Sequence, residues 1–379
     1  MEYATEGVMK RLVELDILRG FLLLLMISNH SPSPLRRFTD QPVGFFSTAE
    51  DFVFVSAFLA GMLFQKRTER QGFEAAKSAT MARALRIYQA HLVTLVFTFA
   101  VGSLFLLQLP GLQDLLSHYW TNPAAAALAS LGLAFQPPLM DILPMYIVFS
   151  LLTPVAFWAA KRFGWRSVFI ASAALWVLSQ FHLRDLLLGP IKSGFPFIDP
   201  GPFDLLSWQF LWVGGLLFGK CLQARQPVKL PVVSEVVFLL LAIGFLIWRW
   251  YCNYVEVDPS ATWWFLNKWH LGPLRVLNFF VVTWLGAKVL PQVARWQEQL
   301  KPLAWVGQNM LPVFAFQICL TLVLVGWLTP ANNPGGLAST ALVVLQTLLA
   351  LLFAWLLDWR RTRQKLADAR PTLGMAHSH

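Results

Sequence analysis

Charged residues are scarce in this chain of 379 residues: Asp, Glu, Lys and Arg make up 13% of it, against about 25% in an average soluble domain. So few charges cannot cover the water-exposed surface of a protein of this length. Hydrophobic residues make up 56% of the chain, and they gather in runs long enough to cross a bilayer. The composition therefore excludes a soluble enzyme and a disordered scaffold, and it predicts a polytopic membrane protein surrounded by lipid.

Cysteine is also rare. Cys221, Cys252 and Cys319 lie in or beside apolar runs without the spacing of metal ligands, which excludes a disulfide framework and a zinc site of the usual kind. We therefore expect no metal. Acidic residues are fewer than basic ones, and the net charge is +10. In a soluble protein this excess would suggest a nucleic-acid partner, but here the distribution of the basic residues between loops accounts for it.

Apolar windows predict an all-α fold with about ten transmembrane helices. One further apolar stretch, 124–135, is too short to cross the membrane, and we expect it to be re-entrant or interfacial. The ten expected spans are 16–30, 43–65, 85–107, 141–160, 167–187, 204–220, 232–252, 271–290, 303–328 and 338–358.

The basic residues predict the orientation of these spans. Most of the 30 Lys and Arg fall in every second loop and in the tail after the last span. Because cytoplasmic loops are enriched in Lys and Arg, both termini are expected in the cytoplasm. The chain then divides into a transmembrane domain, residues 1–358, and a loose, basic, polar cytoplasmic tail, residues 359–379.

Three ionisable residues lie where the outer ends of the first two spans are expected: His30, Glu50 and Asp51. Ionisable groups within a membrane are costly and are functional by default. A carboxylate that accepts a hydrogen bond from one imidazole N–H leaves the other nitrogen as a base for an attacking hydroxyl. The same imidazole could alternatively act as a nucleophile and carry an acyl group transiently. The alternative is a structural hydrogen bond between two neighbouring helices.

Arg83 and Arg86 begin the third span from the cytoplasmic side and share one helix face. Two guanidinium groups together can bind phosphates bidentately, although basic residues at this position also serve as simple membrane anchors. Further polar and aromatic residues near the outer ends of the spans could line a cleft, or could belong to an interfacial aromatic belt. These are Asp141, Tyr146, Trp208, Gln209, Lys268, His270, Arg275 and Gln317.

Several motifs occur in an order that resembles the integral membrane acyltransferases, and among them the OpgC type. The first is Leu15–Gly20 followed by Asn29-His30, and the second is Ser33–Phe38 in the following loop. The others are Ala49–Ser56, Arg83-x-x-Arg86-Ile87-Tyr88, Met140–Tyr146, Trp208–Leu211 and Leu271–Arg275. One departure is Ala57, where the pattern prefers glycine after Ser56.

The resemblance implies a bacterial inner-membrane enzyme that takes an acyl group, by default succinyl, from cytoplasmic acyl-CoA. It would deliver this group to a hydroxyl of a periplasmic glycan. By position, the resemblance assigns His30 as the catalytic base with Glu50 or Asp51 as its acidic partner. It also implies a donor site of Arg19, Arg83, Arg86 and Tyr88, and an acceptor site of Asp141, Trp208, Gln209 and Arg275.

The alternative function is secondary transport of an organic anion or a glycan, with the His–acid pair as a proton relay. Transporters usually show internal repeats and paired broken helices, and neither is evident in this sequence. The sequence leaves open the acyl group, the glycan, the oligomeric state, and the choice between direct transfer and an acyl-histidine.

Overall fold

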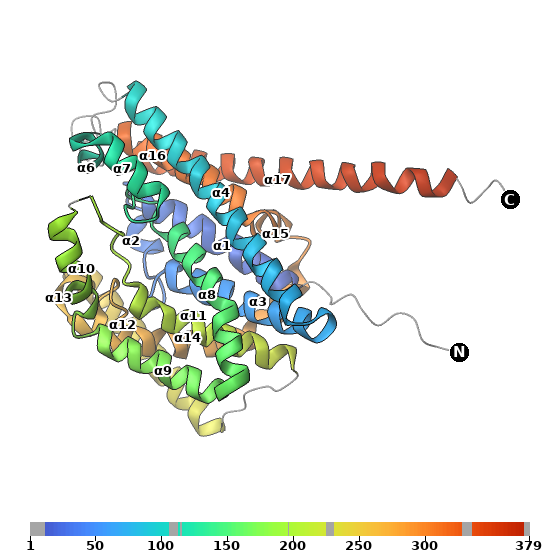
Figure 1. Cartoon of the computed structure of the whole chain (residues 1–379), viewed down its shortest axis with the longest axis horizontal. Helices are drawn as coiled ribbons and strands as arrows, with labels where there is room; N and C mark the ends of the chain where they lie inside the picture. Colours follow the sequence, from blue (N-terminus) through green and yellow to red (C-terminus); the bar gives the residue numbers. More distant parts are fainter. Residues whose placement is uncertain are drawn as a thin grey trace.

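The computed structural model describes residues 12–105, 113, 116–195, 197–224, 231–327 and 336–374. Within these ranges the chain is a bundle of helices without a β-strand, and two of its loops meet in a single isolated bridge between Phe135 and Asp199. Figure 1 shows the long helices packed side by side in one bundle, with α4 and α8 inclined to α17. The all-α prediction is thus confirmed.

Ten helices carry the fold, and eight of those described are long and apolar enough to span a bilayer by length and composition. The other two are α1, which carries Glu14, Asp16 and Arg19, and the shorter α9. The ten are α1 (Val13–His30), α3 (Thr48–Gln71), α4 (Phe73–Phe105), α8 (Ile142–Phe163), α9 (Trp165–Ser179), α11 (Leu205–Gln223), α12 (Val232–Tyr254), α14 (Pro273–Val293), α16 (Met310–Trp327) and α17 (Gly336–Gly374).

Short helices connect or flank these ten. The stretch expected to be re-entrant or interfacial contains one of them, α7, whose start is capped by the side chain of Asn122. The short helices are α2 (Arg36–Thr39), α6 (Ser117–Thr121), α7 (Pro123–Leu131), α10 (Leu183–Gly194), α13 (Pro259–Thr262), α15 (Lys301–Gln308) and the 3₁₀ turns η1 (Trp264–Leu266) and η2 (Ala294–Trp296).

The span expected at 303–328 is broken into α15 and α16 at Asn309, whose backbone leaves the helical region. Pro312 explains the break. In one continuous helix its ring would collide with the carbonyl of Gln308, and it has no N–H to donate to that carbonyl. In the first turn of a new helix neither defect matters. The break places Gln308 and Asn309 against a cavity described below.

Glycines bring two pairs of helices into close contact. A Cβ atom on Gly219 of α11 would lie 1.9 Å from the carbonyl oxygen of Phe58 in α3, and one on Gly307 of α15 would lie 1.8 Å from that of Asp16 in α1. A neighbouring glycine, Gly215, faces Ala57 of α3. The methyl group of Ala57, which departs from the family pattern, is therefore accommodated by the partner helix.

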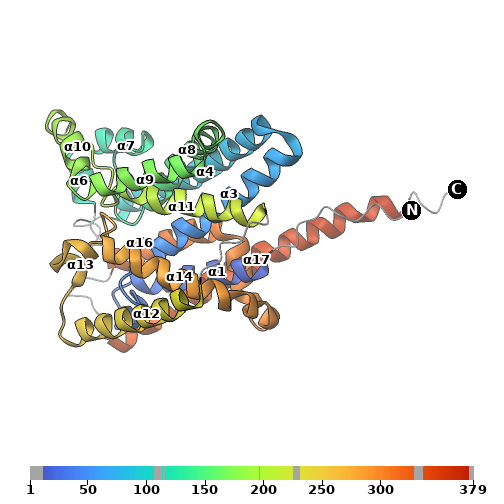
Figure 2. The same cartoon turned by 90° about the horizontal axis from the view of Figure 1, so that it is seen from below.

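Seen from below, α4, α8 and α9 lie on one side of the molecule, α12 and α14 lie on the other, and α3 and α11 run between them (Figure 2). The outer flank of α12 is largely exposed. Its exposed side chains are apolar ones such as Val236, Leu240 and Ile247, as expected of a helix that faces lipid.

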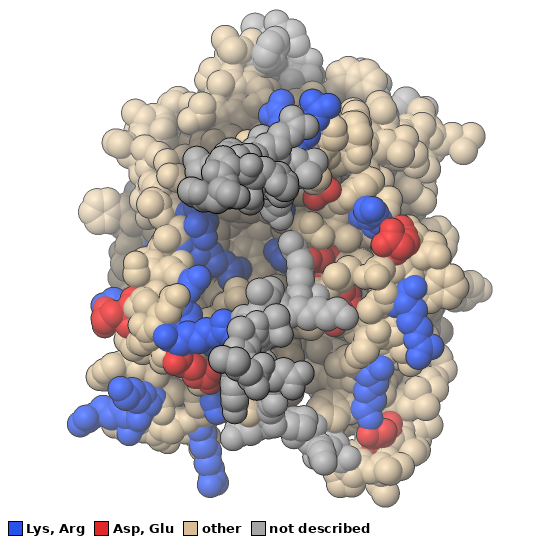
Figure 3. All heavy atoms as spheres, turned by 90° about the vertical axis from the view of Figure 1, so that its right-hand side faces the viewer, with Lys and Arg blue, Asp and Glu red and all other residues tan. Residues whose placement is uncertain are grey.

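The two ends of the bundle differ. One end carries the short elements α2, α10 and α13, and α17 projects from the other (Figure 1). Lys and Arg side chains are spread over the end from which α17 projects (Figure 3). This helix runs through the expected boundary at residue 358 and on to Gly374, so the first part of the basic tail is helical rather than loose. A cytoplasmic location of this end remains a prediction.

Candidate functional site: two cavities that meet inside the bundle

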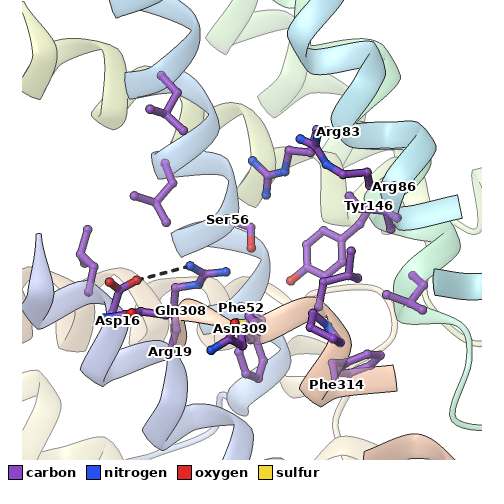
Figure 4. Close-up of a pocket in the computed structure, with 18 of the residues that line it drawn as sticks. Asp16, Arg19, Phe52, Ser56, Arg83, Arg86, Tyr146, Gln308, Asn309 and Phe314 are labelled. Atoms are coloured by element: carbon purple, nitrogen blue, oxygen red, sulfur yellow. Dashed lines mark ion pairs between the residues drawn. The ribbon is translucent and has the colours of Figure 1, made fainter. Parts of the chain in front are cut away.

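The larger cavity, called here the arginine cavity, has a volume of about 750 Å³ and is lined by α1, α3, α4, α8, α15, α16 and α17. Its polar residues include Arg19, Arg83, Arg86, Tyr146 and Asn309. Figure 4 shows the side chains of Arg19 and Arg83 extending into it from opposite sides, with the Tyr146 hydroxyl and Ser56 between them. The cavity therefore concentrates positive charge inside the bundle.

The arginines of this cavity are held differently. Arg19 pairs with Asp16 one turn earlier in α1, at 3.8 Å. Arg361 of α17 donates a hydrogen bond of 2.7 Å to the Asn309 side chain at the break between α15 and α16. Neither Arg83 nor Arg86 has a carboxylate partner among the residues that the structure describes. Unpaired guanidinium groups that line a cavity are suited to binding an anion.

The second cavity, called here the histidine cavity, has a volume of about 490 Å³ and lies at the end of α1 opposite to Arg19. It is lined by His30, Asp141, Lys268 and other polar residues. Nδ1 of His30 is buried and has no hydrogen-bond partner within the described ranges. The imidazole is therefore not committed to a structural hydrogen bond through this nitrogen.

Two charged groups of the histidine cavity are perturbed by their surroundings. Burial raises the pKa of the Asp141 carboxyl to about 6, although the positive charge of Lys268 acts in the opposite direction. Burial also lowers the pKa of the Lys268 ammonium group, which lies 5.1 Å from the centre of the Trp269 ring. Perturbed ionisable groups in a cavity are typical of functional sites.

The two cavities meet inside the bundle, near the His30 end of α1. Met26 of α1 and Ile142 of α8 line both of them, and both side chains are buried. Eleven residues separate Arg19 from His30 on the same helix, which corresponds to about 16 Å along its axis. A cluster of guanidinium groups and a histidine thus stand at opposite ends of one interrupted path through the bundle.

The structure does not bring Glu50 into contact with His30. The Glu50 carboxylate accepts hydrogen bonds from the backbone N–H and the hydroxyl of Ser47, at 3.0 and 2.7 Å, and it forms an ion pair with Arg275 of α14. These contacts occupy its oxygens and hold it within the protein interior. Asp51, the other candidate acid, lines neither cavity. Neither acid forms a hydrogen bond or an ion pair with His30.

Several residues expected to bind a ligand instead join helices. Trp208 is fully buried and donates a hydrogen bond of 3.1 Å to the Trp269 carbonyl. Gln209 donates to the Ser172 carbonyl at 2.9 Å, and its own oxygen accepts the Ser172 hydroxyl at 2.6 Å. Tyr88 donates to the Leu131 carbonyl at 2.9 Å. These residues and Arg275 support the cavities from behind and do not line them.

Sequence reasoning did not assign Asn309 or Arg361 to a site. Pro312 was a signal for the site at Asn309, because a proline inside an apolar run interrupts the helix about one turn earlier. Arg361 has basic neighbours at Arg360 and Arg363, and nothing in the sequence shows which of them faces the interior of the bundle. Arg36 and Asp40 were also missed, and both line the histidine cavity from the loop after α1.

Among the described residues, one group of side chains is close enough together to hold a metal ion. Ligand atoms of His182, Asp185 and His270 lie within 4.8 Å of one another, and the first two residues are exposed. The three residues line neither cavity. The expectation that the protein works without a metal stays a prediction.

The chain matches a known protein family. The family model described as OpgC protein matches residues 11–362, a range that includes every residue lining the two cavities. No curated protein and no solved structure matches the chain. Since the family model covers nearly the whole chain, the protein belongs to the OpgC family.

Proposed function

We propose that the protein is an O-acyltransferase of the bacterial inner membrane, which moves an acyl group from cytoplasmic acyl-CoA to a hydroxyl of a periplasmic glycan. Membership in the OpgC family implies a transferase and suggests a membrane acyltransferase that modifies glucans. The observation that carries the proposal is the meeting of the two cavities at Met26 and Ile142. A donor in one cavity and an acceptor in the other would enter separately and would come together where the two cavities meet.

The arginine cavity would hold the donor. Arg83 and Arg86 lack carboxylate partners among the described residues and would bind the phosphates of CoA, with Arg19 on the opposite wall. Beyond them the lining becomes apolar, with Phe52 and Ile142. This part suits the uncharged pantetheine arm, which would carry the thioester towards the histidine cavity.

The histidine cavity would hold the acceptor and the reacting atoms. An imidazole nitrogen of His30 takes the proton of the acceptor hydroxyl, and the oxygen attacks the thioester carbonyl carbon. The C–S bond then breaks, the ester remains on the glycan, and the CoA thiolate leaves with a proton. Lys268 supplies positive charge in the cavity where the carbonyl oxygen becomes negative. The default acyl group is succinyl.

The first test is transfer by the purified protein in detergent from succinyl-CoA or acetyl-CoA to a glucan oligosaccharide. His30→Ala should lower the rate by about 10²–10⁴-fold, the usual contribution of a general base, and should leave CoA binding unchanged. His182→Ala, which removes an exposed histidine outside both cavities, is the matched control. Full activity of His30→Ala would overturn the mechanism.

The donor site is tested by CoA binding. The double variant Arg83→Ala, Arg86→Ala should bind CoA at least about tenfold more weakly, because hydrogen bonds to charged groups are lost. Arg162→Ala with Arg166→Ala removes two basic residues that do not line the cavity and should leave the affinity unchanged. If both double variants bind CoA with the same affinity, Arg83 and Arg86 do not bind the donor and serve only as membrane anchors. Glycan or anion uptake by proteoliposomes without CoA would instead favour a transporter.

A further inference from the structure

A third cavity, called here the side chamber, lies next to the histidine cavity and is not used by the proposed reaction. Its volume is about 610 Å³, and it is enclosed by the loop around α2, the end of α12 and the segment 257–269. Four residues line both the side chamber and the histidine cavity: Arg36, Asp40, Lys268 and Trp269. The two spaces are therefore neighbours that share a common border.

The wall of the side chamber is held by hydrogen bonds between the α2 loop and α12. Arg249 is 7% exposed; it hydrogen-bonds the Asn253 side chain and donates to the Asp40 carbonyl at 3.2 Å. Its Nε is buried without a hydrogen-bond partner in the described part of the chain. Arg37 donates to the Asn253 carbonyl at 3.2 Å. These contacts fix the α2 loop against α12, so the chamber is formed before any ligand arrives.

The lining of the side chamber mixes both charges with neutral polar groups. The carboxylates are those of Asp40, Glu256 and Asp258, the positive charges are those of Arg36, Arg249 and Lys268, and Asn267 contributes an amide. Because the two signs balance, a polyanion gains no net attraction, and an apolar molecule would leave these polar groups without partners. A neutral molecule rich in hydroxyl groups can both donate to the carboxylates and accept from the guanidinium and amide groups.

The shared border adds an aromatic surface. Trp269 is 38% exposed, and Lys268 lies over its ring. Its backbone is fixed from behind, because Trp208 donates to its carbonyl. A planar apolar surface beside hydrogen-bonding groups is the usual lining of a pocket that orients a partly polar ligand. Sugar rings have an apolar face and hydroxyl edges, and they match this combination.

We propose that the side chamber is a second acceptor subsite, which holds the sugar adjacent to the one whose hydroxyl is acylated at His30. This inference rests on the proposed function, and it adds that the acceptor is an oligosaccharide that occupies both spaces across the border at Trp269 and Lys268. The rate constant kcat/KM should then rise with acceptor length until both spaces are filled.

The test measures acyl transfer to a series of glucose oligomers from one to six units, with a fixed concentration of acyl-CoA. In the wild type, kcat/KM should rise at least about tenfold between the monosaccharide and the longer oligomers. Two variants address the side chamber. Glu256→Ala removes an exposed carboxylate, and Ala261→Trp fills space from the exposed helix α13.

Both variants should keep the wild-type rate on the monosaccharide and the wild-type affinity for CoA, and both should lose most of the gain with length. Leu187→Trp, an exposed position on α10 outside the side chamber, controls for the added indole. A length dependence that survives in both variants, or a wild type indifferent to length, would overturn the subsite while leaving the acyltransferase intact. Absence of transfer to every acceptor would overturn the proposed function itself.

Discussion

The ion pair between Glu50 and Arg275 is enclosed by protein, with side-chain exposures of 0% and 1%. Glu50 also closes the start of α3, because its carboxylate accepts the Ser47 N–H. One carboxylate therefore fixes the beginning of α3 and ties that helix to α14. Removing one member of a buried pair leaves the other charge without compensation, which is more costly than the loss of an exposed pair.

We expect Glu50→Gln to lower the free energy of unfolding by about 3–5 kcal/mol. Arg275→Met should do the same, and the double variant Glu50→Leu, Arg275→Met should be less destabilised than the sum of two single changes. The measurement is thermal unfolding in detergent. Glu74→Gln, which breaks the exposed pair of Glu74 with Lys77, should change stability by less than about 1 kcal/mol.

The opposite result has a clear meaning. If Glu50→Gln unfolds at the wild-type temperature but loses transfer and shows an altered pH profile, Glu50 acts on His30 after all. A small rearrangement during turnover would then bring the two side chains together.

At the level of single residues, the sequence predicted the charged residues of the two cavities better than the contacts that hold the surrounding helices together. Arg19, Arg83, Arg86, His30 and Asp141 were all expected at a site, and all line one of the two cavities. His30 was recognisable because an ionisable group in apolar surroundings needs a reason to be there, whereas the three arginines were assigned to a site by the resemblance to the OpgC type.

The partner of a carboxylate was harder to predict, because sequence spacing does not show which neighbouring helix a side chain faces. Ser47-x-x-Glu50 matches the capping-box pattern, in which the acid turns back to its own helix start. This local signal pointed to the structural role of Glu50. The ion pair with Arg275 depends on the tertiary fold and has no comparable signature in the sequence.

Among the elements, the long helices follow from length and hydrophobicity. Eight of the described helices are long and apolar enough to span a bilayer, against about ten expected spans. The break at Asn309 was not predicted, because a hydropathy window averages over the single proline that causes it. The contact of α3 with α11 was equally hidden. It depends on which glycines face a neighbouring backbone, and only the packed structure shows this.

We expect Gly219→Ala to destabilise the protein by about 1–3 kcal/mol, because the added methyl group would overlap the Phe58 carbonyl and force α11 away from α3. Gly286→Ala in α14 is the matched control, since nothing lies within 4 Å of its added methyl group. The control should be neutral or more stable by about 0.5–1 kcal/mol. The measurement is thermal unfolding of both variants. If Gly219→Ala is as stable as Gly286→Ala, the α3–α11 contact can relax around the added methyl group.

For the whole molecule, the central prediction concerns orientation. The arginine cavity must open to the cytoplasm for CoA to reach it, and the histidine cavity must open to the periplasm. Alkaline phosphatase, which is active only outside the cytoplasm, should therefore be inactive when fused after Gly72 and active when fused after Glu256. These sites follow α3 and α12, whose chain directions through the bundle are opposite. The reverse pattern would place the donor site on the wrong side and reject the proposed reaction.

Met26 is buried and lines both cavities, and its position has a consequence for the living cell. A continuous water-filled passage through an energised membrane would conduct protons and collapse the gradient that drives ATP synthesis. Met26 and Ile142 are apolar, and a narrow apolar constriction excludes water and ions. The thioether of Met26 is also flexible enough to move aside for a slender substrate arm. If the proposed reaction is right, this arrangement would let an acyl group cross the membrane while the membrane stays electrically sealed.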